Sequence, residues 1–178
     1  MSNLNKLLIA NRGEIAIRIT RAAQESGLTT VAIYPEDDVQ SLHVRLADEA
    51  VLLEGRGASA YLDIAQIVQL AKDAGCDGVH PGYGFLSENA NFATAVEAAN
   101  MTFIGPSVAA LDAFGDKAKA RALAQACDVP VVAGLSEAIS IEQAQAFFAA
   151  HADSGILLKA IAGGGGRGMR ICAVQTSW

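Results

Sequence analysis

Residues 6–34 read KLLIANRGEIAIRITRAAQESGLTTVAIY, and this stretch decides the fold. Its first apolar run, 7–10, predicts a buried strand that ends at a turn. Apolar residues then recur at helical spacing up to Gly27, a residue that suits the end of a helix. The run at 29–34 is rich in β-branched residues and predicts a second strand. Together they form a βαβ unit, whose strands are expected to be parallel and joined by a right-handed crossover.

Strand and helix patterns keep alternating as far as about residue 105. A capping-box pair, Asp63 and Gln66, marks the start of one helix. The loop Pro81–Phe85 follows a strand, at the edge where open α/β sheets place their ligands. We therefore predict an α/β fold with a doubly wound, parallel sheet, in which the further strands cover 49–53, 76–80 and 102–104 and the further helices cover about 64–74 and 88–100.

The first turn of this sheet does not match a dinucleotide-binding fingerprint. Asn11–Gly13 stands where such a domain carries GxGxxG, and it keeps one glycine of the three. No acidic residue ends the second strand to bind a ribose, because Tyr34 and Pro35 stand there. The sequence therefore argues against NAD or FAD at this turn.

Beyond residue 105 the pattern changes to helices followed by a hairpin. Ser140 and Gln143 predict a capping box at the start of one of these helices. Two apolar runs, 155–159 and 169–174, flank a glycine-rich segment and predict the two strands of a β hairpin. The helices are expected at 107–114, at 116–127 and after Ser140, where the buried face is predicted to be Ile141, Ala144, Phe147 and Phe148.

The loop of this hairpin carries four consecutive glycines, 163–166, which leave backbone N–H groups open to a ligand. Lys159, Arg167 and Arg170 bracket the glycines, so a polyphosphate could be held by backbone donors and cations together. A flexible linker is the alternative interpretation. Lys117 is predicted in the first turn of a helix, where the helix dipole disfavours a cation, and this favours a role toward the same polyanion.

Composition limits the classes of function that the chain can serve. The 178 residues carry a net charge of −6, which gives no electrostatic footprint for nucleic acid. No apolar run reaches the length of a membrane span, and the polar start lacks the features of a signal peptide. Cys76, Cys127 and Cys172 lie far apart and form no CxxC pair, so neither a disulfide framework nor a zinc site is expected. We predict a cytoplasmic protein.

Five blocks of the chain together resemble the N-terminal part of biotin carboxylase, the ATP-grasp component of biotin-dependent carboxylases of the acyl-CoA and pyruvate type. They follow one another in the order and spacing of that family, and HPGYGFLSEN is the most specific stretch. The blocks are KLLIANRGEIAIRITRAA (6–23), HPGYGFLSENANFA (80–93), FIGPS (103–107), GDK (115–117) and LLKAIAGGGGRGMR (157–170).

The resemblance implies three parts of the chain and a set of nucleotide contacts. Residues 1–105 would form a Rossmann-like domain that precedes the ATP-grasp fold, 106–130 a helical linker, and 131–178 the start of the ATP-grasp lid. It implies that Lys117 and Lys159 contact ATP phosphates or the nearby nucleotide. The closing loop of the lid would include Gly164, Gly165, Gly166 and Met169.

The resemblance also implies a reaction, its cofactors and its partners. Bicarbonate would be activated by ATP as carboxyphosphate, with Mg2+ or Mn2+ at the phosphates, and CO2 would pass to biotin. The biotin is expected on a biotin carboxyl carrier protein or domain. A carboxyltransferase subunit or domain would use the product, and the full-length enzyme is expected to be a homodimer. An acyl-CoA carboxylase, such as acetyl-CoA carboxylase, is our expectation for the whole protein.

We expect the chain to be a fragment that is inactive alone and requires no cofactor of its own. The family's metal-binding glutamates, catalytic base and biotin-site arginine have no counterpart before Trp178, so no catalytic or metal-binding residue is predicted within the chain. The sequence also departs from the family at Ser154, Gly155 and Ile161. Two alternatives stay open: an ATP-grasp ligase of the carbamoyl-phosphate-synthetase type, and a non-catalytic binding module.

Overall fold

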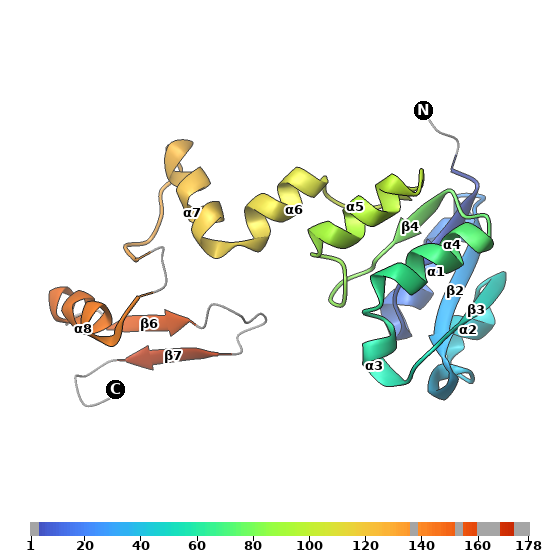
Figure 1. The fold of residues 1–178 in the computed structure, drawn as a ribbon, viewed down its shortest axis with the longest axis horizontal. Coiled ribbons are helices and arrows are strands. Elements are labelled where there is room, and N and C mark those ends of the chain that lie inside the picture. The colour runs from blue at the N-terminus through green and yellow to red at the C-terminus, as the bar shows by residue number, and fades with distance from the viewer. Residues whose placement is uncertain (1–3, 136–138, 152–154, 160–167, 173–178) are drawn as a thin grey trace. The chain divides into compact units, whose positions relative to one another are not determined.

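The computed structural model describes residues 4–135, 139–151, 155–159 and 168–172, without the side chains of Lys117 and Ala118. The chain divides into two compact units, Met1–Asp116 and Lys117–Trp178 (Figure 1). Each unit has a core of its own. They are therefore described one at a time.

The first unit is built on a five-stranded parallel sheet, which confirms the predicted fold class. Its strand order is β3-β2-β1-β4-β5. Because β2 lies on one side of β1 and β4 on the other, the order reverses between β1 and β4. The strands are β1 (Lys6–Ile9), β2 (Thr29–Pro35), β3 (Glu49–Leu53), β4 (Gly78–His80) and β5 (Thr102–Phe103).

Helices pack on both faces of this sheet, as side-chain alternation in β1 requires. Leu8 and the following Ala10 join the larger core with α4 and α5, while Leu7 and Ile9 join a smaller one with α1. The elements that connect the strands are α1 (Gly13–Glu25), a 3-10 turn η1 (Glu36–Asp38), α2 (Leu42–Leu46), α3 (Gly57–Ala60), α4 (Ile64–Asp73) and α5 (Ala90–Ala98), and α6 (Val108–Gly115) follows β5.

The start of α4 differs from the predicted capping box. Asp63 caps the helix as expected, because its carboxylate accepts the N–H of Gln66 at 3.0 Å. The side-chain oxygen of Gln66 does not return to Asp63 but accepts the N–H of Glu54 at 2.5 Å. Only one of the two hydrogen bonds of the capping box is therefore formed, because the loop that follows β3 supplies a better-placed donor for the oxygen of the glutamine.

The second unit contains two helices and an antiparallel hairpin in its described residues. The capping box at Ser140 and Gln143 is confirmed in both directions. Ala144 and Phe148 are buried as predicted, but Ile141 is exposed, so its assignment to the buried face was wrong. Its elements are α7 (Lys117–Ala126), α8 (Ile141–Ala150), β6 (Ile156–Lys159) and β7 (Met169–Cys172).

His43 in α2 gives the first unit a specific sensitivity to acid. Its side chain is 1% exposed, and no described residue lies in hydrogen-bond geometry with either ring nitrogen. Burial lowers the pKa of His43 below its usual value of about 6.5. A lowered pKa in the folded state means that the unfolded chain binds the proton first, so stability is lost as the pH falls below 6.5.

We expect His43→Leu to reduce the loss of unfolding free energy between pH 7 and pH 5. The reason is that one histidine can contribute a slope of at most about 1.4 kcal/mol per pH unit, and leucine removes this contribution. Urea denaturation followed by circular dichroism at several pH values measures the slope. An unchanged slope in the variant would contradict the assignment.

Candidate functional site

The hairpin β6-β7 has two different faces. Ile156 pairs with Cys172, and both side chains are buried against Phe148 of α8. The alternate pairs, Leu157 with Ile171 and Lys159 with Met169, therefore lie on the opposite face. We call these four residues the outer hairpin face.

The outer hairpin face is apolar, exposed and carries one cation at its end. Leu157 is 46% exposed, Met169 49% and Ile171 74%. Lys159 is the last residue of β6 and stands directly across the ladder from Met169, next to the hairpin loop. A surface of this kind suits a ligand with a flat apolar part and an anionic part, because apolar side chains can cover the former and an ammonium can meet the latter.

Two of the predicted site residues are brought together here. Lys159 and Met169 face each other across the ladder. Lys117 is the first residue of α7, but its side chain lies outside the described part, and so do Gly164, Gly165 and Gly166. Their predicted contacts with a nucleotide stay predictions.

The sequence reasoning did not single out Leu157 and Ile171 as members of this face. The sequence does contain a pattern that indicates this face, because both hairpin strands carry apolar residues at consecutive positions. A strand that is covered on one face only usually alternates apolar and polar residues. Apolar residues on both faces indicate that a second surface is to be covered.

The carboxyl end of the parallel sheet is a second candidate position for a ligand, since the strand order reverses there between β1 and β4. The side chain of Asn11, 3% exposed, fills this place. Its amide donates to the carbonyl oxygens of Pro81 at 2.7 Å and Tyr83 at 2.9 Å. A Cβ atom on Gly82 would come within 2.6 Å of the same amide nitrogen. The crevice that a dinucleotide would use is therefore occupied by protein.

The loop after β4 is held by two further contacts. The N–H of Gly82 donates to Nδ1 of His80 at 3.0 Å, and the Tyr83 hydroxyl donates to the carboxylate of Glu14. The bond from Tyr83 lowers the pKa of Glu14, and burial lowers the pKa of His80. His80 thus has a structural role, in which its neutral ring accepts a backbone N–H.

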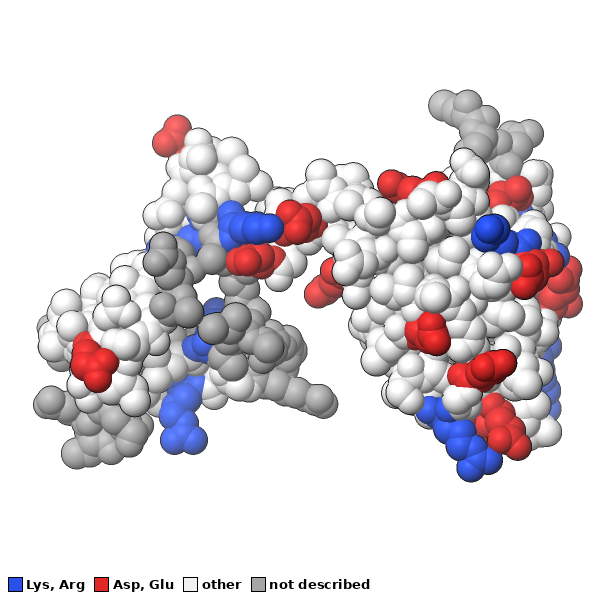
Figure 2. All heavy atoms as spheres, viewed as in Figure 1, with Lys and Arg blue, Asp and Glu red and all other residues white. Residues whose placement is uncertain are grey.

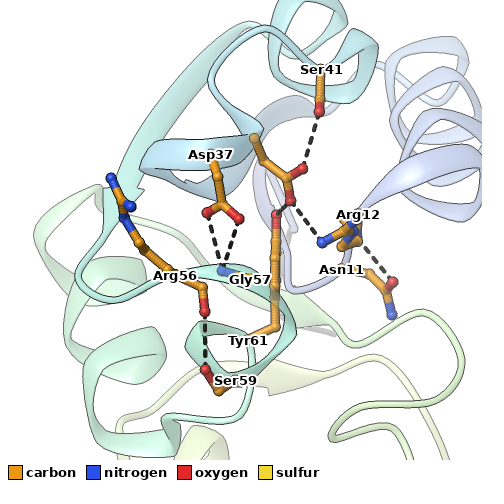
Figure 3. A network of polar contacts seen from close by, with 9 residues as sticks. Asn11, Arg12, Asp37, Ser41, Arg56, Gly57, Ser59 and Tyr61 are labelled. Atoms are coloured by element: carbon orange, nitrogen blue, oxygen red, sulfur yellow. Dashed lines mark hydrogen bonds and ion pairs between the residues drawn. The ribbon is translucent and has the colours of Figure 1, made fainter.

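The loops that follow β1, β2 and β3 meet in a polar network, in which Arg12 and Tyr61 converge (Figure 3) on the carboxylate of Asp38. Arg12 forms an ion pair with Asp38 at 3.2 Å, and the hydroxyl of Tyr61 donates to the same oxygen at 2.9 Å. The guanidinium of Arg12 also lies 5.9 Å from the centre of the Tyr61 ring. Burial and the bond to Asp38 raise the pKa of Tyr61. The polar groups of this network are one another's partners, so we interpret the network as structural support for the edge of the sheet.

Charge is mixed over the surface of the first unit. Figure 2 shows acidic side chains scattered over its visible face, with basic ones beside some of them. Within the residues that the structure describes, no group of three or more His, Cys, Asp or Glu side chains could hold a metal ion. No helix in the same part of the chain is long and apolar enough to span a membrane.

Two family models match the chain, one for each unit. Residues 3–111 match the biotin carboxylase N-terminal domain. Residues 116–177 match the carbamoyl-phosphate synthase L chain, ATP binding domain. The break between the two matches lies close to the end of the first compact unit at Asp116.

Individual relatives are similar over nearly the whole of this chain. Pyruvate carboxylase from Staphylococcus aureus is 49% identical over 96% of it. A single-chain, multi-domain long-chain acyl-CoA carboxylase is 47% identical over 94%, with a TM-score of 0.85 and 15% of its own chain covered. The biotin carboxylase domain of Hydrogenobacter thermophilus 2-oxoglutarate carboxylase, solved with MgADP, ADP and bicarbonate, is 42% identical over 98%, with a TM-score of 0.91 and 38% of its own chain covered.

The curated relatives are much longer than this chain. It spans 15% of the length of the Staphylococcus aureus protein and 14–15% of several others. The similarity therefore concerns one part of those proteins, and that part contains both the parallel sheet and the hairpin.

Replacing Asn11 tests whether the crevice between β1 and β4 depends on its amide. Asn11→Asp keeps the shape but removes both donors and places a carboxylate against two carbonyl oxygens. We expect a loss of unfolding free energy of about 2–4 kcal/mol, because two buried hydrogen bonds are replaced by repulsion. Asn91→Asp, at an exposed position of α5, is the matched control and is expected to change stability by about 0.5 kcal/mol or less. Chemical denaturation measures both, and equal effects would contradict the role of Asn11.

Proposed function

Because the chain belongs to the family of biotin carboxylase N-terminal domains, we propose that it is the amino-terminal, nucleotide-contacting part of an enzyme that carboxylates biotin in an ATP-dependent reaction. The observation that carries the proposal is the outer hairpin face, where Lys159 stands beside Met169 at the edge of the glycine loop. A relative with the same fold was solved with MgADP and bicarbonate. The nucleotide is proposed to lie on this face.

The outer hairpin face fits an adenine nucleotide on chemical grounds. Leu157, Met169 and Ile171 offer an apolar surface for a base, and Lys159 offers an ammonium for phosphate oxygens. Lys117, Gly164, Gly165 and Gly166 are proposed to complete the contacts. When bound, ATP supplies the phosphoryl group that activates bicarbonate, while the described residues bind and orient the nucleotide.

The described residues do not fit a resident metal ion. They contain no group of three metal-binding side chains, and the outer hairpin face has no carboxylate. A Mg2+ or Mn2+ ion that accompanies the nucleotide would have to be ligated by phosphate oxygens and by groups outside the described residues. No catalytic residue is assigned within this chain.

The proposed partners follow from the proposed reaction. Biotin is proposed to arrive on a biotin carboxyl carrier protein or domain and to leave for a carboxyltransferase subunit or domain. A homodimer and a cytoplasmic location belong to the same proposal. The biotin carboxylase domain of the Hydrogenobacter thermophilus relative was solved as a dimer.

The final acceptor of the carboxyl group is proposed to be an acyl-CoA, as in the relative of 47% identity. Relatives named for pyruvate and 2-oxoglutarate are similar over an equal share of the chain. Their shared part therefore does not distinguish the acceptors. Comparing acetyl-CoA, pyruvate, urea and 2-oxoglutarate as acceptors for the intact gene product tests this part of the proposal.

A ligase of the carbamoyl-phosphate-synthetase type is the second candidate, because residues 116–177 match a domain named after that enzyme. The match of 3–111 favours the first candidate, since it covers the larger part of the chain. A non-catalytic binding module is the third. It would keep the fold but would not bind MgATP.

The intact gene product is expected to hydrolyse ATP in a reaction that depends on both biotin and bicarbonate. The 178-residue chain alone is expected to bind MgATP more weakly than the micromolar range and to show no turnover. A coupled assay for ADP measures turnover, and calorimetry measures the affinity for MgATP. Hydrolysis that depends on an ammonia donor and not on biotin would identify the second candidate instead.

Lys159→Gln is expected to weaken MgATP binding by about 10- to 100-fold, because a charge-assisted hydrogen bond to phosphate contributes about 1.5–3 kcal/mol. NMR titration of the labelled chain measures the affinity and maps the site to β6 and β7. The matched control is Lys72→Gln in the last turn of α4. An equal effect of the two substitutions would rule out a contact between Lys159 and the nucleotide.

A further inference from the structure

The chain turns back at the end of α7 and returns along the same helix. The N–H of Val129 donates to the carbonyl of Ala124 at 2.9 Å. Between them Asp128 has a φ of 56°, the left-handed conformation in which many helices end. Residues 129–135, which we call the return segment, then pass beside α7 within the second unit (Figure 1).

The side chain of Arg121 holds the return segment against α7. Its Nη2 donates to the carbonyl of Val132 at 2.6 Å. A Cβ atom on Gly134 would lie 3.6 Å from Nη1 and 3.8 Å from Cζ, so the backbone of the return segment passes over the guanidinium. The Nε atom of Arg121 is buried and has no hydrogen-bond partner among the described residues. The guanidinium is therefore enclosed between the helix and the return segment.

Apolar burial contributes little to this attachment. Val132 is 86% exposed, and Val129 and Leu135 are exposed as well. Hydrophobic stabilisation is proportional to the apolar area that is removed from water, so these side chains hold the return segment only weakly. Beyond Val129, the bond from Arg121 to Val132 is the one hydrogen bond that joins the segment to α7 in the described part of the chain.

Arg121 lies on the same face of α7 as Lys117. Lys117 is the first residue of the helix, and residues four apart in a helix are neighbours on its surface. Two cations at this spacing repel each other, and the positive end of the helix dipole disfavours both. The pair therefore does not serve the stability of the helix. An anion beside this face would remove the penalty.

We propose that Arg121 is a positioning residue for the contact between Lys117 and the nucleotide. By fixing the return segment against α7, it holds the first turn of the helix in one orientation toward the phosphates. The inference rests on the proposed function, in which Lys117 contacts the nucleotide. Arg121 acts through Lys117, since its own Nη2 is used by Val132 and the face of its guanidinium is covered at Gly134.

A double-mutant cycle in the intact gene product tests the proposal, with calorimetry of MgATP binding in the absence of biotin and bicarbonate. Lys117→Gln and Arg121→Met are each expected to weaken binding about tenfold. Methionine keeps the length and helix propensity of arginine but cannot donate. The double variant is expected to match Lys117→Gln alone, because no lysine is left to position. Independent effects, which would multiply to about 100-fold, would overturn the proposal.

One conservative variant and one control separate position from charge. Arg121→Lys keeps the charge but loses the planar fork, so it is expected to stay at least about threefold weaker than the unmodified protein. Full affinity in this variant would assign the effect to charge and contradict the proposal. Lys119→Gln removes a cation from a different face of α7 and is expected to change affinity less than about twofold. An equal loss in Lys119→Gln and Arg121→Met would also contradict it.

The positioning role and the proposed function can fail separately. An intact gene product that binds MgATP but turns over without biotin would refute the proposed function, and the cycle would still decide the role of Arg121. Multiplying effects in a biotin-dependent enzyme would refute the positioning role alone. An intact gene product that does not bind MgATP would refute both. Circular dichroism of each variant confirms that a change in affinity does not come from unfolding.

Discussion

The side chain of Asn11 is the constraint on which the edge of the parallel sheet depends. One buried amide joins the turn after β1 to the loop after β4 through the carbonyl oxygens of Pro81 and Tyr83. Its oxygen accepts the N–H of Arg12, which fixes the start of α1. Gly82 is required beside it, because a side chain there would collide with the amide. Arg12 then reaches Asp38, which Tyr61 also contacts, so the loops after β2 and β3 are tied to the same point.

This constraint explains why a fold that often binds nucleotides at its carboxyl edge is proposed to bind one elsewhere. A ligand between β1 and β4 would have to break two buried hydrogen bonds, at a cost of about 1–3 kcal/mol for each group left unsatisfied. Among the described residues, the outer hairpin face makes no such buried hydrogen bonds that a ligand would have to break. Leu157, Met169 and Ile171 are already exposed, so covering them is favourable in itself. In the proposed function the parallel sheet is therefore a scaffold, and the hairpin is the surface that would bind the ligand.

Local patterns predicted most of the fold, and long-range contacts account for what they missed. The strands and helices of 6–34 follow from periodicity that any short window contains, and so does the cap at Ser140. The capping box paired Gln66 with Asp63 because the two are close in sequence. In the structure the side-chain oxygen of Gln66 accepts the N–H of Glu54, twelve residues away. The role of Asn11 rests on partners 70 and 72 residues away, which no local pattern could reveal. Helical spacing alone predicted Ile141 on the buried face of α8, and spacing does not show which residues pack against each part of that face.

The candidate site shows the same division between local and long-range information. Lys159 stood out because it is one of the cations that bracket the glycine run, and Met169 stood out through a family resemblance. Their meeting across the ladder, and the exposure of Leu157 and Ile171 beside them, follow only from the register of the hairpin. The register puts every second residue of both strands on one face, and the opposite face is already packed on Phe148. A contiguous apolar surface is unfavourable in water, and a nucleotide that covers it would remove the exposed apolar area and bring phosphate oxygens to the ammonium of Lys159.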